Sequence, residues 1–171
     1  VKNIEKLSKS YKAKSKLGKQ SIAVTEIKST SPSLNTTPSG CSIFVDRRTI
    51  EGEKRKDIIN ELENFVGKKG KIKVLHNFMP AWTISTEHIL VKSAVSAYMS
   101  IFNRIPKIDV WPFCSNGSVT CGKKSVPTIG FGPGNPVFAH KANEKIRKEE
   151  VMKATMFYTV FPFVLSFMKR T

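Results

Sequence analysis

The order of structural elements predicted for the N-terminal half constrains the fold more than any other feature of the sequence. Apolar residues recur every three or four positions in residues 1–16, which predicts a helix. Apolar alternation predicts strands over 21–27 and 41–49, and a one-sided apolar pattern predicts a second helix over 54–66. A short strand is expected over 71–75. This order is that of a ferredoxin-like α+β sandwich that lacks its first strand.

The pattern changes after Pro80. Two long helices are predicted, over 86–104 and 147–167, and two short apolar runs between them predict strands over 108–113 and 127–131. Helix, strand, loop, strand and helix are typical of one edge of an α/β sheet. The sequence therefore predicts an α/β chain with two parts that meet near this proline.

The C-terminal stretch 154–168 is strongly apolar. A membrane-spanning helix needs about 20 such residues, and Pro162 interrupts this one. We therefore expect a buried terminal helix and no membrane partner. The N-terminus is rich in lysine and lacks the apolar core of a signal peptide. The three cysteines, an odd number without metal-type spacing, indicate reduced thiols. A cytoplasmic protein is expected.

The charge balance is strongly basic. Lys and Arg number 29 against 13 Asp and Glu, which gives a formal net charge of +16. Such an excess is typical of proteins with anionic partners, including nucleic acids. However, the lysines are spread along the chain, and Tyr11 alone represents the aromatic residues in the densest basic run, from Lys2 to Lys19. A nucleic-acid partner is therefore not favoured, and the basic charge has no assigned role.

One glycine-rich segment has the pattern of a ligand site. A predicted buried strand ends in Gly132-Pro133-Gly134, and His140 follows six residues later. Glycines allow backbone N–H groups to approach a ligand, and α/β sheets place their sites at such strand ends. The alternative is a tight turn followed by a surface histidine. Residue types alone do not decide between these interpretations.

Two separate groups of motifs resemble one family. The segment PTIGFGPGN…AHKANE resembles the C-terminal signature of the zinc-dependent aminoacylase/carboxypeptidase family. That family includes acetylornithine deacetylase, succinyl-diaminopimelate desuccinylase and glutamate carboxypeptidase. Its members place a zinc-ligating histidine in an H-[S/T]-x-N-E context. His140, Asn143 and Glu144 match this context, whereas Lys141 stands where Ser or Thr is usual.

The N-terminal half carries the second group of motifs. Asn35 to Pro38, Asp46 to Arg48 and Glu51 to Glu53 resemble the N-x-x-P…D-x-R…GE pattern of the family's smaller domain, a ferredoxin-like lid that mediates dimerisation. The segments SPSLN, SIFVDRR, FCSNG and TIGFGPGN are similar to the branch described as selenium-metabolism-linked hydrolases. The resemblance implies a partial lid domain over 1–78 and the C-terminal part of the catalytic α/β domain over 79–171.

The resemblance also implies a function. Members hydrolyse an amide bond, in an N-acyl amino acid or a dipeptide-like substrate, with water activated by two zinc ions, or alternatively cobalt or manganese. A homodimer through the lid is implied. His140 would bind metal, and Asn143 and Glu144 would support it. The residues implied to bind substrate are Asn35, Arg48, Asn116, Gly117, Gly132 and Gly134. Asp46 is expected to be structural, and Arg47 to be a solvated strand charge.

Most of the family's metal ligands have no counterpart in this sequence. None of the three histidines stands in the family's H-x-D motif, and no aspartate lies where the bridging ligand is expected. A catalytic zinc needs about three protein ligands. The chain alone is therefore expected to bind no zinc and to be inactive. Two alternatives remain: a non-catalytic dimerisation module, and a basic nucleic-acid-binding protein.

Overall fold

The computed structural model describes residues 2–12, 14–111 and 113–170. Val1 and Ala13, in the first predicted helix, and Pro112, in a predicted strand, lie outside the described residues. The chain divides into two compact units, Val1–Trp82 and Thr83–Thr171, which are described separately. The mixed α/β class predicted from the sequence is confirmed.

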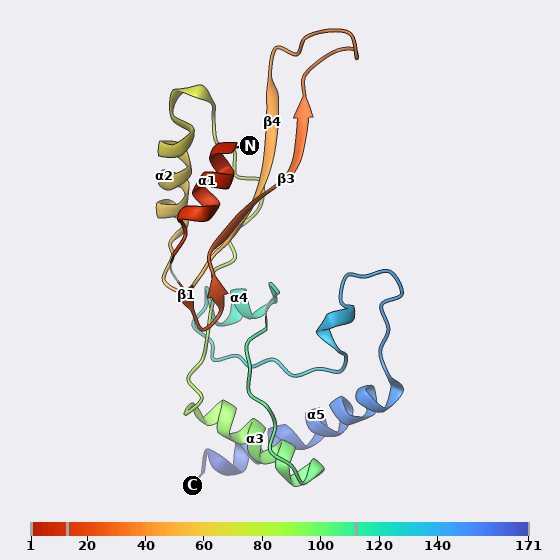
Figure 1. Ribbon diagram of the computed structural model, residues 1–171. Coiled ribbons are helices and arrows are strands. Elements are labelled where there is room, and N and C mark those ends of the chain that lie inside the picture. The colour runs from red at the N-terminus through yellow and green to blue at the C-terminus, as the bar shows by residue number, and fades with distance from the viewer. Residues whose placement is uncertain (1, 13, 112, 171) are drawn as a thin grey trace. The chain divides into compact units, whose positions relative to one another are not determined.

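The first unit is a two-stranded antiparallel sheet with helices beside it (Figure 1). Helix α1 contacts β3. The predicted first helix is shorter than expected, because the chain turns after Ser10 and a small hairpin of β1 and β2 replaces its end. Gly18, at the end of the tight turn between β1 and β2, has a positive φ of +107, which glycine adopts readily. The elements are α1 (Lys2–Ser10), β1 (Lys14–Ser15), β2 (Gly18–Lys19), β3 (Ser21–Ser29), β4 (Cys41–Arg48), α2 (Arg55–Val66) and the 3-10 turn η1 (Gly67–Lys69).

A β-bulge explains the irregular apolar pattern of β3. The register pairs Val24 with Val45 and Glu26 with Phe44, so that Thr25 has no partner on β4. One extra residue shifts the alternation by one position. As a result Ile27, opposite Ile43, lies on the same face of the sheet as Val24 and Val45.

Burial decreases along this apolar face. Ile22, at the base of the β3–β4 hairpin, is only 5% exposed, whereas Ile27, near the tip, is 53% exposed. In Figure 1 the hairpin extends past the ends of α1 and α2, which lie beside its lower half. The far half of the hairpin therefore presents apolar side chains to solvent.

The second unit is built on two packed helices, α3 (Ile89–Phe102) and α5 (Lys148–Met168). The His88 side chain caps α3, since its Nδ1 accepts a hydrogen bond from the Leu90 N–H at 3.1 Å. The buried apolar residues of this unit are Val91, Ala97, Ala154 and Phe157. Two short helical segments, α4 (Gly117–Thr120) and η2 (Pro136–Phe138), lie in the long connection between α3 and α5.

Three predicted strands are absent from the described residues. Residues 71–75, the described part of 108–113, and 127–131 are all irregular. A strand is stabilised by backbone hydrogen bonds to a neighbouring strand, and the strands that the structure describes pair only with one another, β1 with β2 and β3 with β4. These three predictions were wrong because apolar runs alone do not supply a partner.

Helix α5 is apolar but largely uncovered. Among its described residues only Ala154 and Phe157 are buried. By length and composition it could cross a membrane: it has 21 residues, and an 18-residue stretch of it has a mean hydropathy of 1.4, with 11% of that stretch buried. The expectation of a buried terminal helix was therefore wrong for most of its length in this structure.

Candidate functional site

Arg48 lies at the end of β4. Its side chain is on the sheet face opposite the apolar residues Ile22, Val24, Ile27, Ile43 and Val45, which we call the apolar ladder. Its side chain is 57% exposed, and its Nε donates a hydrogen bond to Asp46 Oδ2 at 2.7 Å. Residues two apart on a strand share a face, so the D-x-R spacing places the acid and the arginine side by side. The residues opposite on β3, Ala23 and Ser21, are small and exposed, and they leave this face open.

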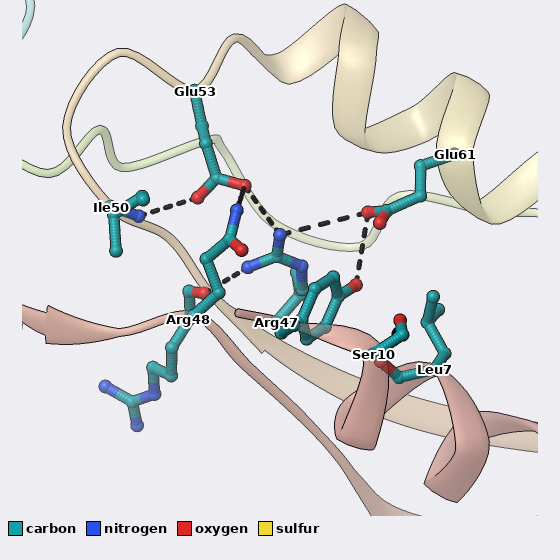
Figure 2. A network of polar contacts seen from close by, with 9 residues as sticks. Leu7, Ser10, Arg47, Arg48, Ile50, Glu53 and Glu61 are labelled. Carbon is teal, nitrogen blue, oxygen red and sulfur yellow. Dashed lines mark hydrogen bonds and ion pairs between the residues drawn. The ribbon is translucent and has the colours of Figure 1, made fainter. Parts of the chain in front are cut away.

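Arg47 points to the other face and is buried, with its side chain 7% exposed. Figure 2 shows its guanidinium between two carboxylates. Its Nη2 lies 2.6 Å from Glu53 Oε1 and 3.8 Å from Glu61 Oε2. Its Nη1 donates to the carbonyl oxygen of Arg48. One buried cation therefore connects β4 to the turn that follows it and to α2.

Tyr11 completes this buried cluster from the end of α1. Its ring lies 4.2 Å from the Arg47 guanidinium carbon, and its hydroxyl donates to Glu61 Oε2 at 3.1 Å. The pKa of Tyr11 is raised above its ordinary value, mainly by burial. The nearby Arg47 guanidinium opposes this change, and the Glu61 carboxylate adds to it. Because Tyr11 is buried under Arg47, its ring is not available to stack on a nucleic-acid base.

Glu53 organises the turn after β4. Its Oε1 also accepts a hydrogen bond from Gln20 Nε2 at 2.6 Å, and its Oε2 accepts one from the Ile50 N–H at 2.6 Å. The D-x-R and GE motifs therefore meet in space through Arg47. We call Tyr11, Gln20, Arg47, Glu53 and Glu61 the arginine cluster.

The expectation that Arg47 is a solvated strand charge was wrong. The sequence contained a usable signal: Arg47 is in phase with Ile43 and Val45, which places it on the buried side of β4. A charge at such a position needs buried partners. What the sequence did not show is that the partners are Glu53 and Glu61.

Asn35 lies in the loop between β3 and β4, where its Oδ1 accepts a hydrogen bond from Ser33 Oγ at 2.7 Å. The register places Arg48 opposite Ser21 at the base of the hairpin, whereas the Asn35 loop follows Ser29 at the other end. Eight strand residues span roughly 25 Å. The structure therefore does not bring Asn35 and Arg48 of one chain together around a small ligand.

His140 lies in the loop that follows η2, with left-handed backbone geometry (φ +60), as does Asn143 (φ +63). The His140 N–H donates to Glu144 Oε2 at 3.2 Å, and the His140 ring lies edge-on to Phe113 at 5.6 Å. The AHKANE and FCSNG segments are thus brought together. Glu144 holds the backbone of the histidine loop in this arrangement.

The glycine turn and α4 lie in the same unit. The Gly134 N–H donates to Glu150 Oε2 at 3.1 Å, with Gly134 at φ +103. Gly132 has no atom near the position a side chain would take. Asn116 precedes α4, where its carbonyl accepts the N–H of Val119 at 2.9 Å, and Gly117 is buried in the first turn.

The described residues do not fit a metal centre. Over residues 2–12, 14–111 and 113–170, no group of three His, Cys, Asp or Glu side chains converges on one point. His140 stands alone, and the nearby Glu144 carboxylate is engaged by a backbone N–H. One imidazole is too few ligands for a catalytic zinc. No reaction step through a metal can be assigned to these residues.

The sequence is similar to one known domain family and to longer proteins from other organisms. Residues 3–74 match the family described as peptidase dimerisation domain. The uncharacterized protein YgeY of Escherichia coli K12 is 31% identical over 163 residues, which cover 85% of this chain and 40% of YgeY. A LysW-lysine/LysW-ornithine hydrolase of Saccharolobus islandicus is 28% identical over 147 residues, covering 86% of this chain and 41% of that protein. The chain thus spans about two fifths of the length of these relatives.

Proposed function

We propose that this chain is the C-terminal portion of a metal-dependent amidohydrolase, in the peptidase family whose dimerisation domain matches residues 3–74. The substrate class is an N-acyl amino acid or a dipeptide-like amide, and the cytoplasm is the proposed location. The main support for this proposal is the match of residues 3–74 to the peptidase dimerisation domain. That match includes the whole β3–β4 hairpin. The relative from Saccharolobus islandicus, named as a hydrolase, supports the same reaction class.

The first role of the chain is to form a homodimer through the lid. A dimerisation domain indicates self-association, and two features of the hairpin support a surface for it. In the two-stranded sheet, β3 and β4 each have one edge without a neighbouring strand among the described residues. Such edges pair readily with another chain. The exposed Ile27 and Ile43 add apolar area beside them.

We expect Ile43→Lys to shift the dimer towards monomer. The substitution places a charge on the exposed apolar ladder, where a second copy would bury it at a cost. Sedimentation velocity over a concentration series would measure the change in the dimer dissociation constant. Ser42→Lys is the matched control, since Ser42 is exposed on the opposite face of the same strand. Equal dissociation constants for wild type and Ile43→Lys would contradict dimerisation through this ladder.

The second role is to complete a catalytic domain. The exposed apolar side of α5, with Val151, Met152, Met156 and Phe163, fits burial against a folded partner segment better than permanent exposure. We propose that the remainder of the catalytic domain covers it. His140 would then join metal ligands from that remainder, and zinc, cobalt or manganese would be the metal.

We expect the isolated 171-residue chain to bind no zinc and to hydrolyse no N-acyl amino acid, because it supplies one ligand. The protein containing the rest of the catalytic domain should bind about two zinc ions per chain, and His140→Ala should lower that number. Elemental analysis after dialysis, with an assay of N-acetyl amino acid hydrolysis, tests both statements. His88→Ala is the control, since His88 only caps α3.

The alternative is a dimerisation module without catalysis. The absence of a metal centre within the described ranges is the observation that favours it. Unchanged zinc content and activity in the His140→Ala form of the longer protein would remove this chain from the metal site. The dimerisation module would then be the better description.

A further inference from the structure

We propose that Asp46 and Arg47 are positioning residues that present the terminal edge of the Arg48 guanidinium, its two Nη groups, to a ligand carboxylate. The carboxylate part of this inference rests on the proposed function, whereas the positioning part does not. Each residue of the triplet Asp46-Arg47-Arg48 then has one task, and that of Arg48 is to bind the ligand. Arg47 fixes the backbone of Arg48 from the buried face, and Asp46 orients its side chain on the open face.

The buried side of this arrangement fixes the end of β4. Arg48 is the last residue of the strand and pairs with Ser21. Its carbonyl accepts a hydrogen bond from Arg47 Nη1, while Glu53 holds both the Arg47 guanidinium and the Ile50 N–H (Figure 2). The Arg48 carbonyl, through Arg47, and the Ile50 N–H, directly, are therefore both tied to the Glu53 carboxylate. Charge-assisted hydrogen bonds of this kind are stronger and shorter than neutral ones.

The exposed side of the arrangement restricts how Arg48 can bind. A guanidinium offers a carboxylate either the edge made by Nε and one Nη or the edge made by both Nη groups. Asp46 accepts from Nε at 2.7 Å, which engages the first edge. The second edge remains for an incoming carboxylate, and the small facing residues Ser21 and Ala23 do not block it.

An ion pair on β3 has the same two-residue spacing as Asp46 and Arg48 but no contact with the arginine cluster. Glu26 and Lys28 on β3 are also two residues apart, with side chains 48% and 60% exposed and a distance of 3.1 Å. No member of the arginine cluster contacts them in the described hydrogen bonds and ion pairs. This pair therefore has the same exposure and spacing as Asp46 and Arg48 but lacks the buried support, which makes it a matched control.

The test is nuclear magnetic resonance of the Arg48 Nε–H group in the 171-residue chain. In wild type we expect slow exchange of this proton with water. Asp46→Asn should accelerate exchange about tenfold through loss of the charged acceptor. Arg47→Lys should also accelerate it, because lysine cannot hold both Glu53 and the Arg48 carbonyl in the same way. Glu26→Gln should leave it unchanged.

The second readout is a titration with N-acetylglycine. We expect it to shift the Arg48 side-chain resonances in wild type and to bind several-fold more weakly to Asp46→Asn and Arg47→Lys. Unchanged Nε–H exchange in Asp46→Asn, a surface variant that leaves the buried cluster intact, would overturn the positioning role. If exchange responds to the variants but N-acetylglycine leaves wild-type Arg48 unshifted, positioning stands and the carboxylate ligand is wrong.

Discussion

Replacing Arg47 with methionine is expected to lower the unfolding free energy of the first unit by about 3 kcal/mol. Methionine keeps most of the packing volume but leaves the largely buried Glu53 carboxylate without its cation. Glu53 retains Gln20 and the Ile50 N–H as donors, and these offset part of the loss. Urea unfolding, followed by hydrogen exchange of peptides from α1 and β4, measures the change in this unit alone.

Arg48→Met is the matched control for this prediction. Arg48 is the next residue on the same strand and has the same side chain, but it is exposed and its partner Asp46 is also exposed. Exposed ion pairs contribute about 0–1 kcal/mol. A similar loss of stability in both variants would mean that burial of Arg47 does not determine its contribution. A loss below 1 kcal/mol in Arg47→Met would contradict the arginine cluster as the main polar support of the lid.

Phe157→Ala is expected to cost the second unit about 3–4 kcal/mol. Phe157 is 2% exposed and lies between two other rings, Phe131 at 4.0 Å and Phe161 at 5.4 Å between centroids. Removing the ring leaves a cavity and also releases Phe131, which precedes the glycine turn. Thermal unfolding monitored in peptides of α3 and α5 measures the effect.

Phe163→Ala on the same helix provides both a control and a test of the proposed function. Phe163 is 74% exposed in this chain, so its loss should change stability by less than about 0.5 kcal/mol. In the protein that includes the rest of the catalytic domain, the same substitution should cost about 2–4 kcal/mol if that domain buries the ring. An equally small effect in both contexts would show that nothing covers this side of α5.

The hairpin of the first unit illustrates how much of the fold local sequence can predict. Alternation in β4 places Ile43, Val45 and Arg47 on one face, and the polar pair Thr25-Glu26 in β3 marks the bulge. These features depend on side-chain alternation along one strand, which the sequence displays directly. The motifs in the same region predicted the dimerisation domain, and the family match confirmed it.

The site residues could be predicted less completely. Motif spacing singled out Arg48 and His140, but it did not show that Arg47 is buried or that Glu144 engages the His140 backbone. The roles of Asn35, Asn116, Gly117, Gly132, Gly134 and Asn143 in substrate or metal binding remain predictions. Their positions in loops depend on contacts between segments that are distant in the sequence.

The sequence by itself determined the alternation of β3 and β4, the apolar faces of the helices and the two groups of family motifs. These properties are set by residues within a few positions of one another. The tertiary structure decided which carboxylates pair with Arg47, how far burial extends along the hairpin, and which apolar runs remain irregular. Pairing partners and burial depend on which distant segments pack together, because a buried charge or a strand is stable only when another part of the chain supplies its hydrogen bonds.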